Sequence, residues 1–343
     1  MATVHLLSAA TRAPSPWEYA LDDLNRMRQS AARDRFGVHT LTEDPGRADV
    51  ILFVENCDPT RHYLEVRRHP VYRQYRDKCF LFSRHDHPVP FLPGVYASIP
   101  RRWHDPRRTR GGLYLNAFDH SFLSYDPTPT PRPYLYSFIG QVGTHPLRER
   151  LMALPQHDAF LFDTTPYWPY AELPAGTQSA LEAQYVETAL RSKFVLCPRG
   201  RGASSIRLFE MMRMGRAPVI ISDAWTPPDG PDWDAVSVRI AEADLARLPE
   251  VLRARADEAE AMGERARRCW NDWFSEAATF HRVTNWCLAL KRARGAGTAS
   301  PWPRVLPQLL RPLYLKRLLR TVRARVTERS PSRPAVPAAD PVE

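Results

Sequence analysis

The chain has 343 residues, which is more than one hydrophobic core usually organises, so two domains are expected. Hydrophobic residues make up 43% of the chain and charged residues 25%, a balance typical of a soluble globular protein and unlike that of a wholly disordered chain. The net charge of +10 favours anionic partners: nucleotide phosphates, anionic lipid or nucleic acid.

The cysteine pattern and the first residues indicate a cellular compartment. The five cysteines are widely spaced and form no Cys-x-x-Cys pair, which argues against a disulfide scaffold and against a structural zinc site. The N-terminus lacks the charged and apolar regions of a signal peptide. No run approaches the roughly 18 apolar residues of a transmembrane helix. We therefore expect a protein of the reducing cytoplasm.

The first part of the chain alternates between strand and helix patterns. Residues 48–55 ("ADVILFVE") predict a buried strand because branched apolar residues dominate them. Further strands are expected at 4–7 and 79–83, and helices at 17–30 and 62–78, the second broken or bent at Pro70. This alternation predicts a parallel sheet covered by helices, in an N-terminal domain over residues 1–125.

A stiff connector, "DPTPTPRP" at 126–133, separates this domain from a second one over 134–293. The expected strands of the second domain are 134–140, 158–163, 193–198, 217–223 and 234–240. Its expected helices are 146–154, 177–192, 204–215, 243–254 and 256–293, the last with a kink at Gly263. Two doubly wound halves leave a cleft between them, and such sheets bind ligands outside the carboxyl ends of their strands.

The last part of the chain, residues 294–343, has a different character. Residues 313–326 place leucine and valine on one helical face and lysine and arginine largely on the other. A basic amphipathic helix beside a disordered tail is typical of a segment that lies on an anionic membrane surface. A terminal helix docked on its own domain would show the same pattern, so both interpretations stand.

The most informative stretch is the loop in "KFVLCPRGRGASS" at 193–205. Two glycines let its backbone approach a ligand closely, a serine can cap the next helix, and three arginines can form charge-assisted hydrogen bonds. Because the N–H groups at a helix N-terminus bind anions, the loop is a candidate phosphate site. The residues concerned are Arg199, Gly200, Arg201, Gly202, Ser204, Ser205 and Arg207.

The helix that follows carries Arg207 and Glu210 three residues apart, on one face. Phosphate near Arg207 and a ribose bonded to Glu210 would match a nucleoside diphosphate lying over the helix. An exposed Arg–Glu ion pair would have the same spacing, and spacing alone favours that simpler interpretation. The stretch is neither a P-loop nor a GxGxxG motif.

Residues 192–223, "SKFVLCPRGRGASSIRLFEMMRMGRAPVIISD", closely resemble the signature of the exostosin-like glycosyltransferases, glycosyltransferase family 47. That family continues from a Cys- or Pro-containing turn to Gly, Ser-x-Arg-x-x-Glu, and a small residue before Pro-Val-Ile-Ile-x-Asp. Upstream, "YLYSFIGQVGTHPLRERL" at 134–151 resembles the opening of the family's donor domain, and "SRHDHPVPF" at 83–91 resembles a His-Asp segment of its N-terminal half. The resemblance covers residues 80–290 and is strongest over 134–240.

The resemblance implies the GT-B fold, in which two Rossmann-like doubly wound domains face a central cleft. It also implies an inverting transfer from a nucleoside-diphosphate sugar, with a UDP-sugar as the expected donor and with no obligatory metal or other cofactor. Residue by residue, it implies that the donor is bound by Gly140, Gly143, Arg148, Arg199, Gly200, Ser204, Ser205, Arg207, Glu210 and Asp223.

An inverting transfer needs a base that takes the proton from the acceptor hydroxyl, and we expect it from the N-terminal side of the cleft. Asp86 is the first candidate and His85 the second, although this His-Asp segment could equally be a polar turn. Arg207 is expected to stabilise the departing diphosphate. Weaker candidates are Asp58 as a base and Asp163 and Trp225 as contacts of the donor.

These expectations describe a glycosyltransferase of surface polysaccharide synthesis, acting on a glycan or lipid-linked acceptor at the inner face of the cell membrane. The chain lacks the N-terminal membrane anchor of animal family members, which favours a bacterial-type cytoplasmic enzyme. The alternative is a catalytically inactive nucleotide-sugar-binding or scaffold protein of the same fold. A nucleic-acid binder is disfavoured because the arginines are scattered outside the tail. A fucosyltransferase-like enzyme is disfavoured because its Thr-Glu-Lys run is missing.

Overall fold

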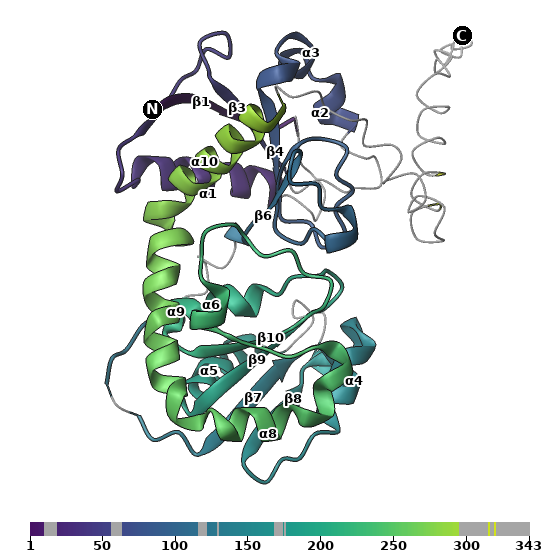
Figure 1. The fold of residues 1–343 in the computed structure, drawn as a ribbon, viewed down its shortest axis with the longest axis vertical. Helices are drawn as coiled ribbons and strands as arrows, with labels where there is room; N and C mark the ends of the chain where they lie inside the picture. Colours follow the sequence, from purple (N-terminus) through teal and green to yellow (C-terminus); the bar gives the residue numbers. More distant parts are fainter. Residues whose placement is uncertain are drawn as a thin grey trace, which may run out of the picture.

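A computed structural model describes residues 1–9, 19–55, 64–115, 122–128, 130–167, 174, 176–294, 315 and 319. Over these residues the chain forms two parallel sheets, one above the other along the long axis of the molecule (Figure 1). The two-domain, doubly wound α/β architecture expected for a GT-B protein is confirmed.

The N-terminal sheet has the strand order β2-β1-β3-β4-β5-β6. Its strands are β1 (Ala2–Leu7), β2 (His39–Leu41), β3 (Val50–Glu55), β4 (Cys79–Ser83), β5 (Gly94–Tyr96) and β6 (Thr109–Gly111). Its helices are α1 (Tyr19–Ala32), α2 (Leu64–Arg68) and α3 (Pro70–Gln74). The break or bend expected at Pro70 is a break: Pro70 opens α3, and the Nδ1 atom of His69 accepts a hydrogen bond from Val71 N at 3.3 Å.

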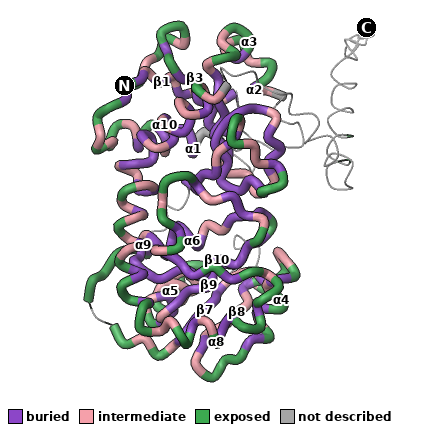
Figure 2. Tube along the Cα trace, in the orientation of Figure 1, coloured by how far each residue is buried: buried purple, intermediate pink, exposed green. Residues whose placement is uncertain are grey.

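The C-terminal sheet has the order β11-β10-β9-β7-β8. Its strands are β7 (Tyr134–Gly140), β8 (Ala159–Asp163), β9 (Ser192–Pro198), β10 (Ala217–Ile221) and β11 (Val238–Arg239). The helices are α4 (Pro146–Met152), α5 (Thr177–Leu190), α6 (Ile206–Met214), α7 (Trp233–Val236), α8 (Leu248–Ala254), α9 (Ala259–Trp273) and α10 (Glu276–Arg294). The central strands of both sheets are buried, as Figure 2 shows.

Two expected elements differ from the structure. The single strand expected over 234–240 is wrong: Asp232 accepts a hydrogen bond from Ala235 N at 3.2 Å and starts the short helix α7, which leaves only the two residues of β11. The kink expected at Gly263 is also wrong, because the long C-terminal helix breaks after Trp273 instead. Gly263 lies inside α9, where a Cβ atom would collide with the carbonyl oxygen of Gly215.

Both sheets place their first strand beside their third: β1 lies beside β3 and β7 beside β9. Ligands of doubly wound sheets bind outside the carboxyl ends of the strands at this switch point. In the N-terminal sheet the edge there carries Ser8, Ala9 and Glu55. In the C-terminal sheet it carries Gly140 and Arg199.

The helix α10 connects the two halves. It follows α9 of the lower domain and runs up along the side of the molecule to α1 of the upper domain (Figure 1). Ser30 Oγ donates a hydrogen bond to Glu276 O at 2.5 Å and accepts one from Phe280 N at 2.9 Å. A hydrophobic cluster continues from Leu52 in β3 through Phe280 to Phe209 in α6, so part of the core is shared between the domains.

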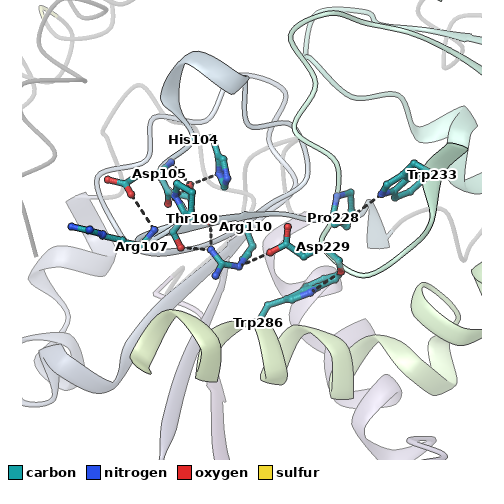
Figure 3. A network of polar contacts seen from close by, with 10 residues as sticks. His104, Asp105, Arg107, Thr109, Arg110, Pro228, Asp229, Trp233 and Trp286 are labelled. Carbon is teal, nitrogen blue, oxygen red and sulfur yellow. Dashed lines mark hydrogen bonds and ion pairs between the residues drawn. The ribbon is translucent and has the colours of Figure 1, made fainter. Parts of the chain in front are cut away.

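A second connection, which we call the seam, joins residues 224–229 to residues 100–111 (Figure 3). Arg110 Nε forms an ion pair with Asp229 at 2.8 Å, and Trp286 Nε1 of α10 donates to Asp229 O at 3.2 Å. Gly111 lies so close to this loop that a Cβ atom would be 2.5 Å from Thr226 O. The seam and α10 together fix how the two carboxyl edges face each other.

None of the described helices has the length and apolarity needed to span a bilayer. The basic segment 313–326 lies outside the described residues, except for Leu315 and Leu319, which are exposed.

We predict that Gly111→Ala destabilises the protein by about 1–3 kcal/mol, because the added methyl group meets backbone that cannot rotate away. Gly143→Ala is the matched control, since its Cβ atom would find nothing closer than 3.6 Å. Thermal and guanidinium unfolding of both variants measure the difference, and equal losses at the two positions would contradict a close-packed seam.

Candidate functional site

Arg148 holds together the two turns at the switch point of the C-terminal sheet. From α4, its guanidinium donates to Arg199 O at 2.9 Å, Gln141 O at 2.9 Å and Pro198 O at 3.1 Å. Burial, and then the charge of Arg207, lower the pKa of Arg148 to about 9. Arg148 was expected to bind the sugar donor. In the structure its N–H groups instead hold the backbone turns that would surround the sugar donor.

The turn after β7 is shaped by Asp163 at the end of β8. Asp163 Oδ1 accepts hydrogen bonds from Val142 N at 3.0 Å, Thr165 N at 2.8 Å and Thr165 Oγ1 at 2.5 Å. Burial acts to raise the pKa of this carboxyl, but the hydrogen bonds outweigh it and the pKa is lowered. Gly143 N also approaches Thr165 Oγ1, at 3.3 Å. Gly143 and Asp163, both singled out in the sequence, therefore belong to one turn.

Arg207 and Glu210 are both buried in α6, each only 8% exposed, so the simpler interpretation of an exposed ion pair is wrong. Arg207 donates to Ile139 O and lies over the ring of Phe138, with 4.6 Å from Cζ to the ring centroid. Gly140 is required beside it, because a Cβ atom there would lie 2.5 Å from Arg207 Nη2. Arg207 thus sits under the end of β7, at the switch point.

Half-buried Tyr185 in α5 contacts both Arg207 and Glu210, and the sequence analysis missed it. Its hydroxyl donates to Glu210 Oε2 at 2.5 Å, and its ring lies 5.6 Å from the Arg207 Cζ atom. Burial, followed by the charge of Glu210, raises the pKa of Tyr185 well above its usual value, so the hydroxyl keeps its proton. A single tyrosine within a helical segment gives no local sign of this role.

The loop between β9 and α6 meets the N-terminal domain. Ser204 N donates to Ser98 Oγ at 3.1 Å, and a Cβ atom on Gly202 would lie 2.8 Å from Asp86 O. Asp86 Oδ1 in turn accepts a hydrogen bond from Tyr114 at 3.0 Å. The structure therefore brings Asp86 and the candidate phosphate loop together, although they lie in different domains. Gly200 packs against Arg148, and Ser205 is the first residue before α6.

The remaining candidates lie around this group. His85 Nδ1 accepts a hydrogen bond from His87 N at 2.9 Å, so the His-Asp segment forms a polar turn as well as facing the loop. Asp223 is exposed and exchanges hydrogen bonds with Glu242, which also lies 3.7 Å from Arg199 Nη1. Trp225 is buried in the seam against Trp233. Asp58 lies outside the described residues.

Glu55 is a second residue that the sequence analysis missed. It ends β3 with 1% of its surface exposed, and it accepts hydrogen bonds from Ala9 N at 2.5 Å and Ser8 Oγ at 3.1 Å. Burial raises its pKa to about 7, against the lowering effect of these two bonds. The available signal was a carboxylate at the end of an otherwise apolar buried strand.

No group of three side chains that could hold a metal occurs among the residues that the structure describes. The sequence does contain one Asp-x-Asp, at Asp232 and Asp234, but both side chains are exposed and Asp232 caps α7.

We predict that Tyr185→Phe lowers stability by about 1–3 kcal/mol, because it leaves the buried Glu210 carboxylate without its hydrogen-bond donor. Tyr134→Phe, at the start of β7, is the matched control, because this ring is also half-buried but its hydroxyl bonds to no buried carboxylate among the described residues. Urea unfolding would contradict the role of Tyr185 if the two variants lost the same stability.

We also predict a pH-dependent effect of Glu55→Gln. Since the native pKa of Glu55 is about 7 against 4.5 ordinarily, the folded chain holds a proton between these values that the unfolded chain releases. The stabilising effect of this group is complete below pH 4.5 and is lost as the pH rises through 7. The Tm of the wild type relative to Glu55→Gln should therefore fall over that range, while the exposed control Glu250→Gln shows no such trend.

Comparison with known proteins assigns part of the chain, including the part of this site in the C-terminal domain, to a family. The exostosin GT47 domain model matches residues 114–255. An exostosin-1 homologue of Caenorhabditis elegans is 41% identical over 71 residues, 20% of this chain and 19% of that protein. Exostosin-1b of Danio rerio is 26% identical over 199 residues, 54% of this chain and 26% of that protein. The chain thus spans at most about a quarter of the length of these relatives.

Among solved structures, WaaG, a glycosyltransferase involved in lipopolysaccharide biosynthesis, superposes with a TM-score of 0.35 and 14% identity over 87% of this chain and 100% of WaaG. MurG of Acinetobacter baumannii gives 0.29 and 10% over 74% of each chain. Scores this low carry no weight for function. The family match instead contains Arg148, Arg207, Glu210 and Tyr185. Residues 114–255 of the chain therefore match the exostosin GT47 domain, and the chain is similar to exostosins over this region.

Proposed function

We propose that the protein is a glycosyltransferase that moves a sugar from a nucleoside-diphosphate sugar to a hydroxyl of a glycan or lipid-linked acceptor. The observation that carries this proposal is the pair of buried residues Arg207 and Glu210 with their partner Tyr185, beneath the turns after β7 and β9, in the region that matches the GT47 domain. Buried charges cost free energy unless they are compensated or used, and here they lie at a switch point where ligands bind.

The donor would lie over the loop between β9 and α6. Arg207, exposed Arg201 and the N-terminus of α6 would stabilise the negative charge that develops on the departing diphosphate, without a metal ion. Glu210 Oε2 already accepts from Tyr185, and its other oxygen is suited to a ribose hydroxyl. An attack by the acceptor on the opposite side of the anomeric carbon would invert its configuration. A UDP-sugar is the expected donor.

The acceptor would enter from the N-terminal domain, at the edge that carries Asp86 and Glu55. The finer assignment is a role in surface polysaccharide synthesis in the cytoplasm, on the inner face of the membrane. Its support is the basic amphipathic pattern of residues 313–326, in which Leu315 and Leu319 are exposed one helical turn apart.

A catalytically inactive nucleotide-sugar-binding or scaffold protein of the same fold is the alternative. It would keep the same buried group and the same donor binding, and it would differ only in showing no transfer.

The first experiment is a thermal-shift screen with UDP, GDP, CDP and dTDP, each with and without EDTA. A ligand at about 100 times its Kd stabilises the native state by about 2.7 kcal/mol. We expect one nucleoside diphosphate to raise the Tm whether or not EDTA is present, and Glu210→Ala to abolish this rise. Glu250→Ala, which removes an exposed carboxylate of α8, is the control and should retain it. A folded wild type that responds to none of the four would contradict the proposal.

The membrane assignment has its own test. Deleting residues 304–343 should abolish co-sedimentation with vesicles that contain phosphatidylglycerol, and neutral phosphatidylcholine vesicles should bind neither protein. Equal binding of the full chain and the deletion variant to anionic vesicles would exclude the segment as an anchor.

A further inference from the structure

We propose that Glu55, acting through Ser8, accepts the proton of the acceptor hydroxyl during transfer. This inference rests on the proposed function, and it assigns the base to a different strand from the one that carries Asp86 and His85.

The first support is position. Glu55 ends β3 and Ser8 follows β1, and these neighbouring strands run in register, with Leu7 opposite Phe53. This is the switch point of the N-terminal sheet, the place where a doubly wound sheet binds a ligand. The same edge faces the donor domain, since Ser98, two residues beyond β5, bonds to Ser204 of the phosphate loop. With strands about 4.8 Å apart, Glu55 lies two strands, or about 10 Å, from the end of β5.

The second support is the surroundings of the carboxylates near this edge. Asp23 is buried but forms ion pairs with Arg84 at 2.6 Å and Arg26 at 3.2 Å. Asp86 accepts a hydrogen bond from Tyr114, and its charge acts to raise the pKa of nearby Arg148. A neighbouring cation favours the ionised form of a carboxylate. At Asp23 burial still raises the pKa, against the lowering effect of Arg84 and Arg26.

Glu55 differs from both. Among the residues that the structure describes, no cation pairs with it, and its partners are the hydroxyl of Ser8 and the N–H of Ala9. The acidic residue Glu65, at the start of α2, adds a further charge that favours protonation. A pKa of about 7 suits a group that must be ionised before the reaction and hold a proton after it.

Ser8 provides the route to the buried carboxylate. It is half-buried, and its Oγ donates to Glu55 Oε2 at 3.1 Å. In the transfer step, the acceptor hydroxyl proton moves to Ser8 Oγ as the Ser8 proton moves to Glu55 Oε2. The acceptor oxygen then bonds to the anomeric carbon with its electron pair, and the bond from that carbon to the diphosphate breaks. Nucleoside diphosphate leaves as the anion, and protonated Glu55 later releases its proton to water.

A purely structural role for Glu55 is the competing explanation, because its bond to Ala9 N shapes the chain after β1. Glu55→Gln separates the two roles. Its amide oxygen can still accept from Ala9 N, but the amide cannot take a proton from Ser8.

The experiment measures release of nucleoside diphosphate from the donor found in the thermal-shift screen, with water or an oligosaccharide as acceptor, from pH 5 to 9. The proteins are the wild type, Glu55→Gln, Ser8→Ala and Asp86→Asn. We expect the wild-type rate to rise through pH 7 and level off. Glu55→Gln should lower kcat by about 100-fold or more and remove the rise, while its donor-induced Tm shift stays that of the wild type.

Ser8→Ala should lower kcat as well. Because Ser8 is only half-buried, this variant should stay folded, and it replaces Glu55→Gln in the test if Glu55→Gln unfolds below the assay temperature. Asp86→Asn should keep the pH profile. A Glu55→Gln or Ser8→Ala protein with the wild-type rate and profile overturns the assignment, as does loss of the rise in Asp86→Asn alone. A wild type that binds no nucleoside diphosphate overturns the proposed function itself, and the assignment with it.

Discussion

The three hydrogen bonds of Arg148 to the backbone of Gln141, Pro198 and Arg199 are the constraint on which the donor edge depends. They lock the turn after β7 to the turn after β9, although these segments are separated by more than fifty residues of chain. Carbonyl groups at strand ends normally bond to water, and here one half-buried guanidinium satisfies them instead. The positions of Gly140, Gly200 and the start of α6 follow from this bonding.

The unit from β9 through α6 to β10 was predicted from the sequence almost to the residue. Strand 193–198 is Ser192–Pro198, and helix 204–215 is Ile206–Met214. This succeeds because the signals are local: a continuous apolar run, a Pro-Gly turn and a 3.6-residue period. The spacing of Arg207 and Glu210 also predicted that both lie on the same face of the helix. Their burial was not predicted, because it depends on Phe138 and Tyr185 in other elements.

The features that could not be predicted all depend on contacts between segments that are distant in sequence. The break after Trp273 and the passage of α10 to the N-terminal domain are decided by Ser30 and its neighbours in α1, not by Gly263. The contact of Ser98 with Ser204 joins two loops that carry no shared pattern. Glu55 was read as the end of an apolar strand, since its pKa is set by a desolvation that appears only when β1 and β3 pair.

The two carboxyl edges that face each other differ in their electrostatics, and this difference suits group transfer. On the C-terminal side, the charge of buried Arg207 disfavours the charge of half-buried Arg148, so an anion placed there relieves repulsion. On the N-terminal side, Glu55 is buried with no cation paired to it among the described residues, and burial raises its pKa to about 7. In the proposed transfer, negative charge would leave toward the first edge and a proton toward the second. Each edge would then stabilise the species that it receives, and the seam would hold the two edges in place.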